Sequence, residues 1–166
     1  MAVTHKMYGP FYENLMKANI PSLIAAGTTI KVALMYDDGG GEPVAFSFDQ
    51  NHDNWADVMA YECTDADYVD EGGAGAGVGG QEILLKAVTY ALRVTTFDTT
   101  SDPKKITFTA SGNITATHAV IYLDEALDAD SKLISCIDFG GERESVEGEF
   151  SITWDASGIF KVTVAE

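Results

Sequence analysis

The amino-acid sequence predicts an all-β protein: one antiparallel β-sandwich, of jelly-roll or immunoglobulin-like type, with a short N-terminal helix. Segments rich in β-branched and aromatic residues recur about every 11–16 residues over the second half of the chain. Turn signals built from Gly, Asp, Asn, Ser and Pro separate these segments. The 166 residues fit a single domain (1–166), and no linker or internal repeat divides them.

The first part of the chain predicts one helix and one strand. Pro10 suits a first helical turn, so a short helix is expected over Phe11–Ala18, ending near Asn19. The residues before the helix form an N-terminal arm (1–10) without an obvious core role. Thr28–Tyr36 carries apolar residues at both odd and even positions, which predicts a strand that is covered in part on both faces.

Glycine dominates the interpretation of the next segment. Asp37–Gly41 is expected to end the strand, because glycine tolerates the positive φ of turns. Asp53–Val58 could form a short capped helix with Asp53 as its N-cap. Residues 71–80 form a predicted glycine-rich loop. Its G-x-G-x-x-G motif, Gly75–Gly80, lacks the preceding strand and following helix of a dinucleotide site, and the acidic residues before it would repel a pyrophosphate.

From residue 83 onward, the predicted elements are strands. Phe150, Ile152 and Trp154 alternate with polar residues, so Trp154 is expected in the core. Gly140–Gly141 is one of the expected turns between strands. The predicted strands are Lys105–Ala110, Ala116–Leu123, Lys132–Asp138, Gly148–Trp154 and Ile159–Val164, preceded by a β-rich stretch over Ile83–Thr96.

The chain is strongly acidic, with 26 acidic against 10 basic side chains and a formal net charge of −16 at pH 7. Lys104 and Lys105 are the only adjacent basic pair. Nucleic acids and anionic membranes are disfavoured as partners, because both are bound through clustered basic residues. The acidity favours solubility and mutual repulsion of free subunits; a specific cationic partner or a bound cation is the alternative.

No targeting segment or membrane span is expected. Met1–Pro10 lacks an apolar stretch of about 7–15 residues, and no run approaches the roughly 18 apolar residues of a span. We therefore expect the protein to be synthesised in the cytoplasm. Cys136 lies in a strand-like segment and is predicted to be an inert core thiol, whereas Cys63 could be exposed. A disulfide between Cys63 and Cys136, or between subunits, is the alternative.

Catalytic signatures are absent from the sequence, so neither an enzyme nor a cofactor is expected. The chain has no G-x-S-x-G or H-E-x-x-H motif and no closely spaced zinc ligands. A triad of His118, Cys136 and an Asp could be assembled only in space. A glycoside hydrolase would need two close carboxylates in an aromatic-lined cleft, and the chain has only two tryptophans, Trp55 and Trp154.

Carboxylates gather in two segments. One extends from Glu62 to Glu71, and the other contains Asp124, Asp128 and Asp130. Calcium prefers six to eight oxygen ligands, so these three aspartates are weak calcium candidates. Neither segment fits an EF-hand loop, and a solvated acidic loop is the simpler interpretation.

Several segments together resemble a known family. The strand at Thr28–Met35 is followed by Asp53–Val58, Ala119–Tyr122, Cys136–Gly140 and finally the segment from Phe150 to Ile159. This pattern resembles small virion structural proteins of tailed bacteriophages, which are often encoded among head genes. The resemblance runs from about Phe11 to Val164 and is clearest in the C-terminal half. Residues 72–80 and 124–131 are longer than in the family pattern.

The resemblance implies a β-sandwich on the virion, as a capsid decoration or cement protein on the head surface. Its partner would be the major capsid protein, with self-association into a small homo-oligomer also open. A tail- or fibre-associated module that binds a receptor or carbohydrate, with or without calcium, is the alternative. The candidate capsid contacts are Val3, Thr4, His5, Lys6, Met7, Tyr8 and Trp55.

Overall fold

The computed structural model describes residues 3–19, 21–36, 46–63, 80–91, 94–101, 103–109, 113–145 and 149–163. Strands dominate these residues, which confirms the predicted all-β class. None of the helices in these ranges has the length and apolar character needed to cross a membrane. The elements are β1 (Thr4–Met7), α1 (Gly9–Met16), β2 (Thr29–Met35), the 3₁₀ helices η1 (Trp55–Asp57) and η2 (Met59–Tyr61), β3 (Gln81–Glu82), β4 (Lys86–Ala91), β5 (Val94–Thr99), β6 (Lys105–Thr109), β7 (Ile114–Asp124), β8 (Leu133–Ser145), β9 (Glu149–Thr153) and β10 (Phe160–Thr163).

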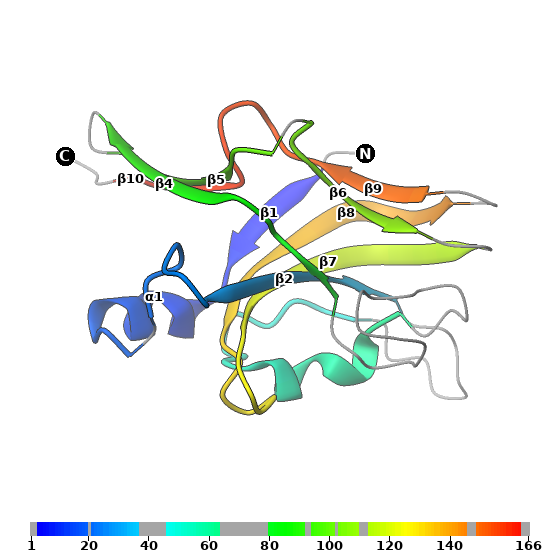
Figure 1. The fold of residues 1–166 in the computed structure, drawn as a ribbon. Coiled ribbons are helices and arrows are strands. Elements are labelled where there is room, and N and C mark those ends of the chain that lie inside the picture. Colours follow the sequence, from blue (N-terminus) through cyan, green and yellow to red (C-terminus); the bar gives the residue numbers. More distant parts are fainter. Residues whose placement is uncertain are drawn as a thin grey trace.

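The strands form three antiparallel sheets. The largest has the order β1-β8-β7-β2-β3, and the smaller ones have the orders β10-β5-β4 and β6-β9. Figure 1 shows the smaller sheets above one face of the five-stranded sheet, a sandwich-like layering. Aromatic contacts join the layers: the ring of Phe139 on β8 lies 5.8 Å from that of Phe150 on β9. The predicted apolar face of β9 is confirmed, because Phe150, Ile152 and Trp154 are all buried.

Both faces of the five-stranded sheet are covered, as the pattern of Thr28–Tyr36 predicts. One face packs toward the smaller sheets. The other is covered by the segment 46–63, where the Trp55 ring stacks on Tyr122 at 4.3 Å and 12° and the Phe46 ring meets His118 edge-on at 5.0 Å. This double coverage explains why most of β2 and the middle of β7 are buried.

Local predictions hold with shifted bounds. The helix begins at Gly9, two residues before the predicted start. The capped helix predicted at 53–58 is a 3₁₀ turn whose N-cap is Asn54 rather than Asp53. The Asp57 carboxylate accepts the amides of Asp53 (2.9 Å) and Asn54 (3.1 Å), which anchors the start of this turn.

One expectation about strand boundaries is refined and another is wrong. The β-rich stretch 83–96 divides, because β4 and β5 pair with each other in antiparallel register. The predicted turn at Gly140–Gly141 lies inside β8. There the register with β7 changes from Ala116 opposite Arg143 to His118 opposite Asp138. Both glycines have positive φ, 72° and 138°, so their freedom produces a bulge in one long strand instead of a turn between two.

The N-terminal arm is part of the sheet, contrary to the expectation that it lacks a core role. Residues 4–7 pair with β8, where Lys6 lies opposite Cys136. Tyr8 is wholly buried, and its amide donates to the carbonyl of Ile134 at 3.1 Å. The sequence Thr-His-Lys-Met shows no apolar alternation, so this strand cannot be recognised from its own residues.

Both cysteines are buried, and no disulfide joins them. Burial confirms the core position of Cys136 and raises the pKa of its thiol to about 12. The expectation that Cys63 could be exposed is wrong. Its amide donates to the carbonyl of Leu34 at 2.8 Å, and its thiol lies 3.4 Å from the carbonyl of Thr115. These contacts hold Cys63 against the sheet.

Candidate protein-docking surface

An uncharged cleft of about 290 Å³ lies between α1 and the three-stranded sheet. Phe11 anchors the helix in the core. Leu15, four residues later and therefore on the same face of the helix, is half-exposed and lines the cleft. On the opposite wall, Val88 of β4 lies across from Phe97 of β5. The lining residues are Phe11, Leu15, Ala18, Pro21, Ser22, Leu23, Val88, Thr95, Phe97 and Phe160, none of them charged.

The chain closes the floor of this cleft with an unusual helix end. Ala18 has a φ of 56°, a left-handed conformation that glycine normally supplies after a helix. The next amide, from Asn19, donates to the carbonyl of Asn14 at 2.9 Å. This reversal sends the chain under the three-stranded sheet and places Leu23 in the cleft wall.

Exposed apolar side chains extend from the cleft. Met16 is 87% exposed at the end of α1, and Ile24 follows the cleft residue Leu23. Tyr90, two residues beyond Val88 on the same face of β4, is 71% exposed. Isolated apolar residues are common on protein surfaces, but a group of them beside an apolar hollow makes this hollow a candidate binding site. We call Leu15, Met16, Ile24, Val88 and Tyr90 with their cleft the docking surface.

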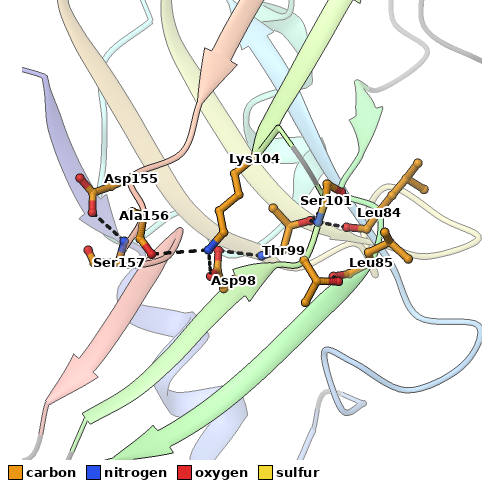
Figure 2. Close-up of polar contacts among 10 residues, drawn as sticks. Leu84, Leu85, Asp98, Thr99, Ser101, Lys104, Asp155, Ala156 and Ser157 are labelled. Atoms are coloured by element: carbon orange, nitrogen blue, oxygen red, sulfur yellow. Dashed lines mark hydrogen bonds and ion pairs between the residues drawn. The ribbon is translucent and has the colours of Figure 1, made fainter.

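A strained bend precedes β4. Leu85 has a φ of 50°, which is rare for a leucine. Its carbonyl accepts hydrogen bonds from the amide of Thr100 (2.9 Å) and from that residue's hydroxyl (3.3 Å). The hydroxyl of Thr99 donates to the carbonyl of Leu84 at 2.7 Å, as Figure 2 shows. These bonds hold the bend while Leu84 and Leu85 stay exposed, and strain of this kind gathers at functional sites.

A polar network holds the end of β5 in place beside this bend. Lys104 forms an ion pair with Asp98, and its ammonium lies 3.5 Å from the carbonyl of Ala156 (Figure 2). The Asp155 carboxylate accepts the amide of Ser157 at 2.7 Å. Hydrogen bonds from Ser157 hold the pKa of Asp155 below its usual range. The network ties the hairpin of β4 and β5 to the turn after β9.

The predicted contact residues divide into exposed and buried ones. Val3, Thr4, His5 and Lys6 are exposed and Met7 is half-buried, whereas Tyr8 and Trp55 are buried and cannot touch a partner in this fold. The His5 ring lies 2.8 Å from the Ser135 hydroxyl. Although much of His5 is exposed, neighbouring groups such as Phe160 partly desolvate its ring, which lowers its pKa, whereas a backbone hydrogen bond with Ile159 raises it. Val3, Thr4, His5, Lys6 and the half-buried Met7 therefore stay predicted contacts.

The calcium candidates do not converge. Asp124 forms an ion pair with Lys31 at 3.2 Å, and the backbone carbonyl of Asp128 accepts the amide of Ala56 at 3.3 Å. Within the described ranges, no group of three or more His, Cys, Asp or Glu side chains, Asp130 included, could hold a metal ion. In the other acidic segment Glu62 is buried, and residues 64–71 lie outside the described residues, as do 37–41 and 72–79.

A second, larger hollow of about 580 Å³ lies between β9 and the edge formed by β1 and β8. Its walls combine apolar residues such as Phe139 with charged ones. Arg143 donates to the carbonyl of Phe139 at 3.1 Å, Glu144 accepts from Asn113 at 3.2 Å, and Glu149 lies 3.7 Å from Lys105. Each of these charged groups already has a partner within the chain.

The His118 ring packs edge-on against the ring of Phe46. Its Nε2 lies 3.8 Å from the Asp138 carboxylate, and its Nδ1 lies 3.0 Å from the Thr117 hydroxyl. Burial lowers the pKa of His118 from 6.5; Asp138 opposes this shift and Lys6 adds to it.

His118 is expected to make the protein less stable in mild acid. Because its pKa is lower in the folded chain, the unfolded chain binds the proton more tightly below pH 6.5. The free energy of unfolding should therefore fall from pH 7 to pH 5, and less so in His118→Gln. Urea unfolding of both proteins across this range measures the difference. Equal slopes would show that His118 does not carry the effect.

Comparison with known protein families, characterised proteins and solved structures finds no match to this chain. The docking surface therefore rests on its own geometry. The sequence did not predict Val88 and Tyr90 as part of this surface, nor the exposed Leu84 and Leu85 beside it. The reason is that the whole stretch 83–96 is rich in β-forming residues. The alternation of Val88 and Tyr90 with Thr89 was the available signal.

Proposed function

We propose that the chain is a virion structural protein that decorates the outer surface of a bacteriophage head and binds the major capsid protein. The observation that carries this proposal is the docking surface: an uncharged cleft ringed by exposed apolar side chains on a highly acidic protein. Such a surface fits another folded protein, because burial of its apolar groups stabilises a complex. The resemblance to phage virion proteins is the reason for placing this partner on a bacteriophage head.

Charge supports an outward-facing position. A net charge of −16 would be repelled by packaged DNA but tolerated on the outside of a shell. Repulsion between free copies would also limit their association before they reach a shell. Many identical contacts across a lattice then retain the protein even when each contact is modest.

Cryo-electron microscopy of the phage particle whose genome encodes this chain tests where on the particle the chain lies. We expect copies on the head in numbers set by icosahedral symmetry, with the docking surface against the shell. Density confined to the tail or fibres would replace decoration with the receptor- or carbohydrate-binding alternative. Absence from the particle would overturn a virion role.

The double variant Leu15→Glu/Met16→Glu is expected to lose at least about tenfold in affinity for heads stripped of the chain, since it places two charges where apolar groups are buried. Both side chains are exposed, so the melting temperature should change little. Co-sedimentation with heads measures binding. The control is Ser151→Glu/Thr153→Glu on the exposed side of β9, which adds the same charge; equal loss in both variants would implicate charge alone.

A further inference from the structure

We propose that β4 receives an extended segment of the partner subunit by strand addition, with an apolar side chain of that segment in the cleft and basic residues beside it. This inference rests on the proposed function as a subunit-binding protein and specifies how the partner is held. It starts from the position of β4, which is an outer strand of the three-stranded sheet in the order β10-β5-β4.

The backbone of β4 has groups ready for another strand. The amide of Thr100 donates to the carbonyl of Leu85, and the register continues from Lys86 along β5. In an antiparallel ladder, alternate residues direct both N–H and C=O toward the same neighbour. Leu85 therefore faces β5, and Val88 and Tyr90 direct their backbone groups away from it, toward the open edge.

The edge lacks the devices that keep natural edge strands from pairing. Charged side chains, prolines and bulges usually protect such edges. In β4 the only charged residue is Lys86, at its first position, and its ammonium lies 3.1 Å from Glu82. The remaining residues are Ala, Val, Thr and Tyr, in unbroken register with β5. From Ala87 to Ala91 the edge is uncharged, and an outer strand of this kind is a template for β-augmentation.

Side chains of an added strand would reach the cleft. Val88 lines the cleft and Tyr90 follows on the same face of β4. Residues of a paired strand alternate in the same way, so every second side chain would point toward Leu15 and Leu23. Backbone pairing gives affinity and the cleft selects an apolar side chain, the usual division in strand addition.

The negative charge of this chain favours basic residues at the two ends of the partner segment. Within the described residues, six lysines form ion pairs with carboxylates of the same chain, which reduces the positive charge that this protein offers to an acidic partner. The excess of 16 negative charges then favours a segment with Lys or Arg beside its apolar residues, and disfavours a second copy of this chain. The six are Lys17, Lys31, Lys86, Lys104, Lys105 and Lys132.

A synthetic peptide of alternating valine and threonine with a lysine at each end tests the proposal on the full chain. Backbone pairing tolerates sequence, so this generic probe should bind, and an otherwise identical peptide with glutamate ends should bind at least about tenfold more weakly in low salt. Tyr90→Pro removes an outward amide, whereas Tyr90→Ala removes only the ring. We expect at least a further tenfold loss in Tyr90→Pro relative to Tyr90→Ala.

Isothermal titration and amide hydrogen exchange of Val88 and Tyr90 measure these effects. Should Tyr90→Pro fail to fold, Val88→Lys places a charge on the same edge and serves instead. Equal binding by Tyr90→Pro and Tyr90→Ala, no binding of either peptide, or sedimentation as a dimer paired through β4 would overturn strand addition. Cryo-electron microscopy showing a decorated head without a strand beside β4 would remove this inference alone, whereas an undecorated head would remove the proposed function.

Discussion

Replacement of Trp55 by alanine is expected to lower the free energy of unfolding by about 3–5 kcal/mol, the usual cost of deleting a buried large aromatic side chain. The indole is only 3% exposed and stacks on Tyr122 at 4.3 Å. Its removal would leave a cavity between the segment 46–63 and the five-stranded sheet. Urea unfolding followed by circular dichroism gives the difference, provided that the m-value is unchanged.

Two further variants serve as controls for Trp55→Ala. Trp55→Phe keeps a ring over Tyr122 and should lose less stability, whereas Tyr90→Ala removes an exposed ring and should change stability by less than about 0.5 kcal/mol. The sequence suggested that Trp55 is a contact residue. A Trp55→Ala protein that keeps its stability but fails to bind heads would restore that role and contradict the buried position.

Gly80→Ala is expected to destabilise the protein by at least about 3 kcal/mol, because two costs combine. The φ of Gly80 is +71°, and an added Cβ would lie 2.3 Å from the carbonyl oxygen of Val32 and 2.6 Å from its carbonyl carbon. Val32 belongs to β2, which is paired with β7 on one side and β3 on the other. Since this backbone cannot move freely, the clash should displace the chain that enters β3.

Gly27→Ala separates the two costs. Gly27 has a similar φ of +86°, but an added Cβ meets nothing within 4 Å. Its substitution should therefore cost only about 1 kcal/mol, the price of the left-handed backbone conformation. Similar unfolding midpoints for the two variants would mean that contact with Val32 carries no weight.

Local alternation made much of the fold predictable. Phe150, Ile152 and Trp154 could be assigned to a buried face because strand periodicity needs only neighbouring residues. Thr4–Met7 could not be recognised as a strand, because its pairing partner lies about 130 residues away on β8. The glycines at 140 and 141 marked a backbone irregularity, but the same conformations serve a turn and a bulge.

The docking surface could not be predicted from the sequence for a related reason. The bend before β4, where Leu84 and Leu85 are exposed, depends on hydrogen bonds from Thr99 and Thr100 at the end of β5. The cleft likewise forms only when Leu15 and Val88 approach across the space between a helix and a separate sheet. The spacing of residues along the chain predicts each element, but it does not predict that α1 and the three-stranded sheet come close together. Asp124, Asp128 and Asp130 are close along the chain, but within the described residues they are not part of any group of three or more side chains that could hold a metal ion.

The enclosed cysteines have a consequence outside the cell. A particle released from its host passes from a reducing to an oxidising medium, where accessible thiols form cross-links. Here both sulfur atoms lie beneath other side chains, and the thiolate form of Cys136 is strongly disfavoured at neutral pH. If the chain decorates a shell as proposed, its copies would therefore not become cross-linked through these thiols in an oxidising medium, and non-covalent contacts alone would retain them.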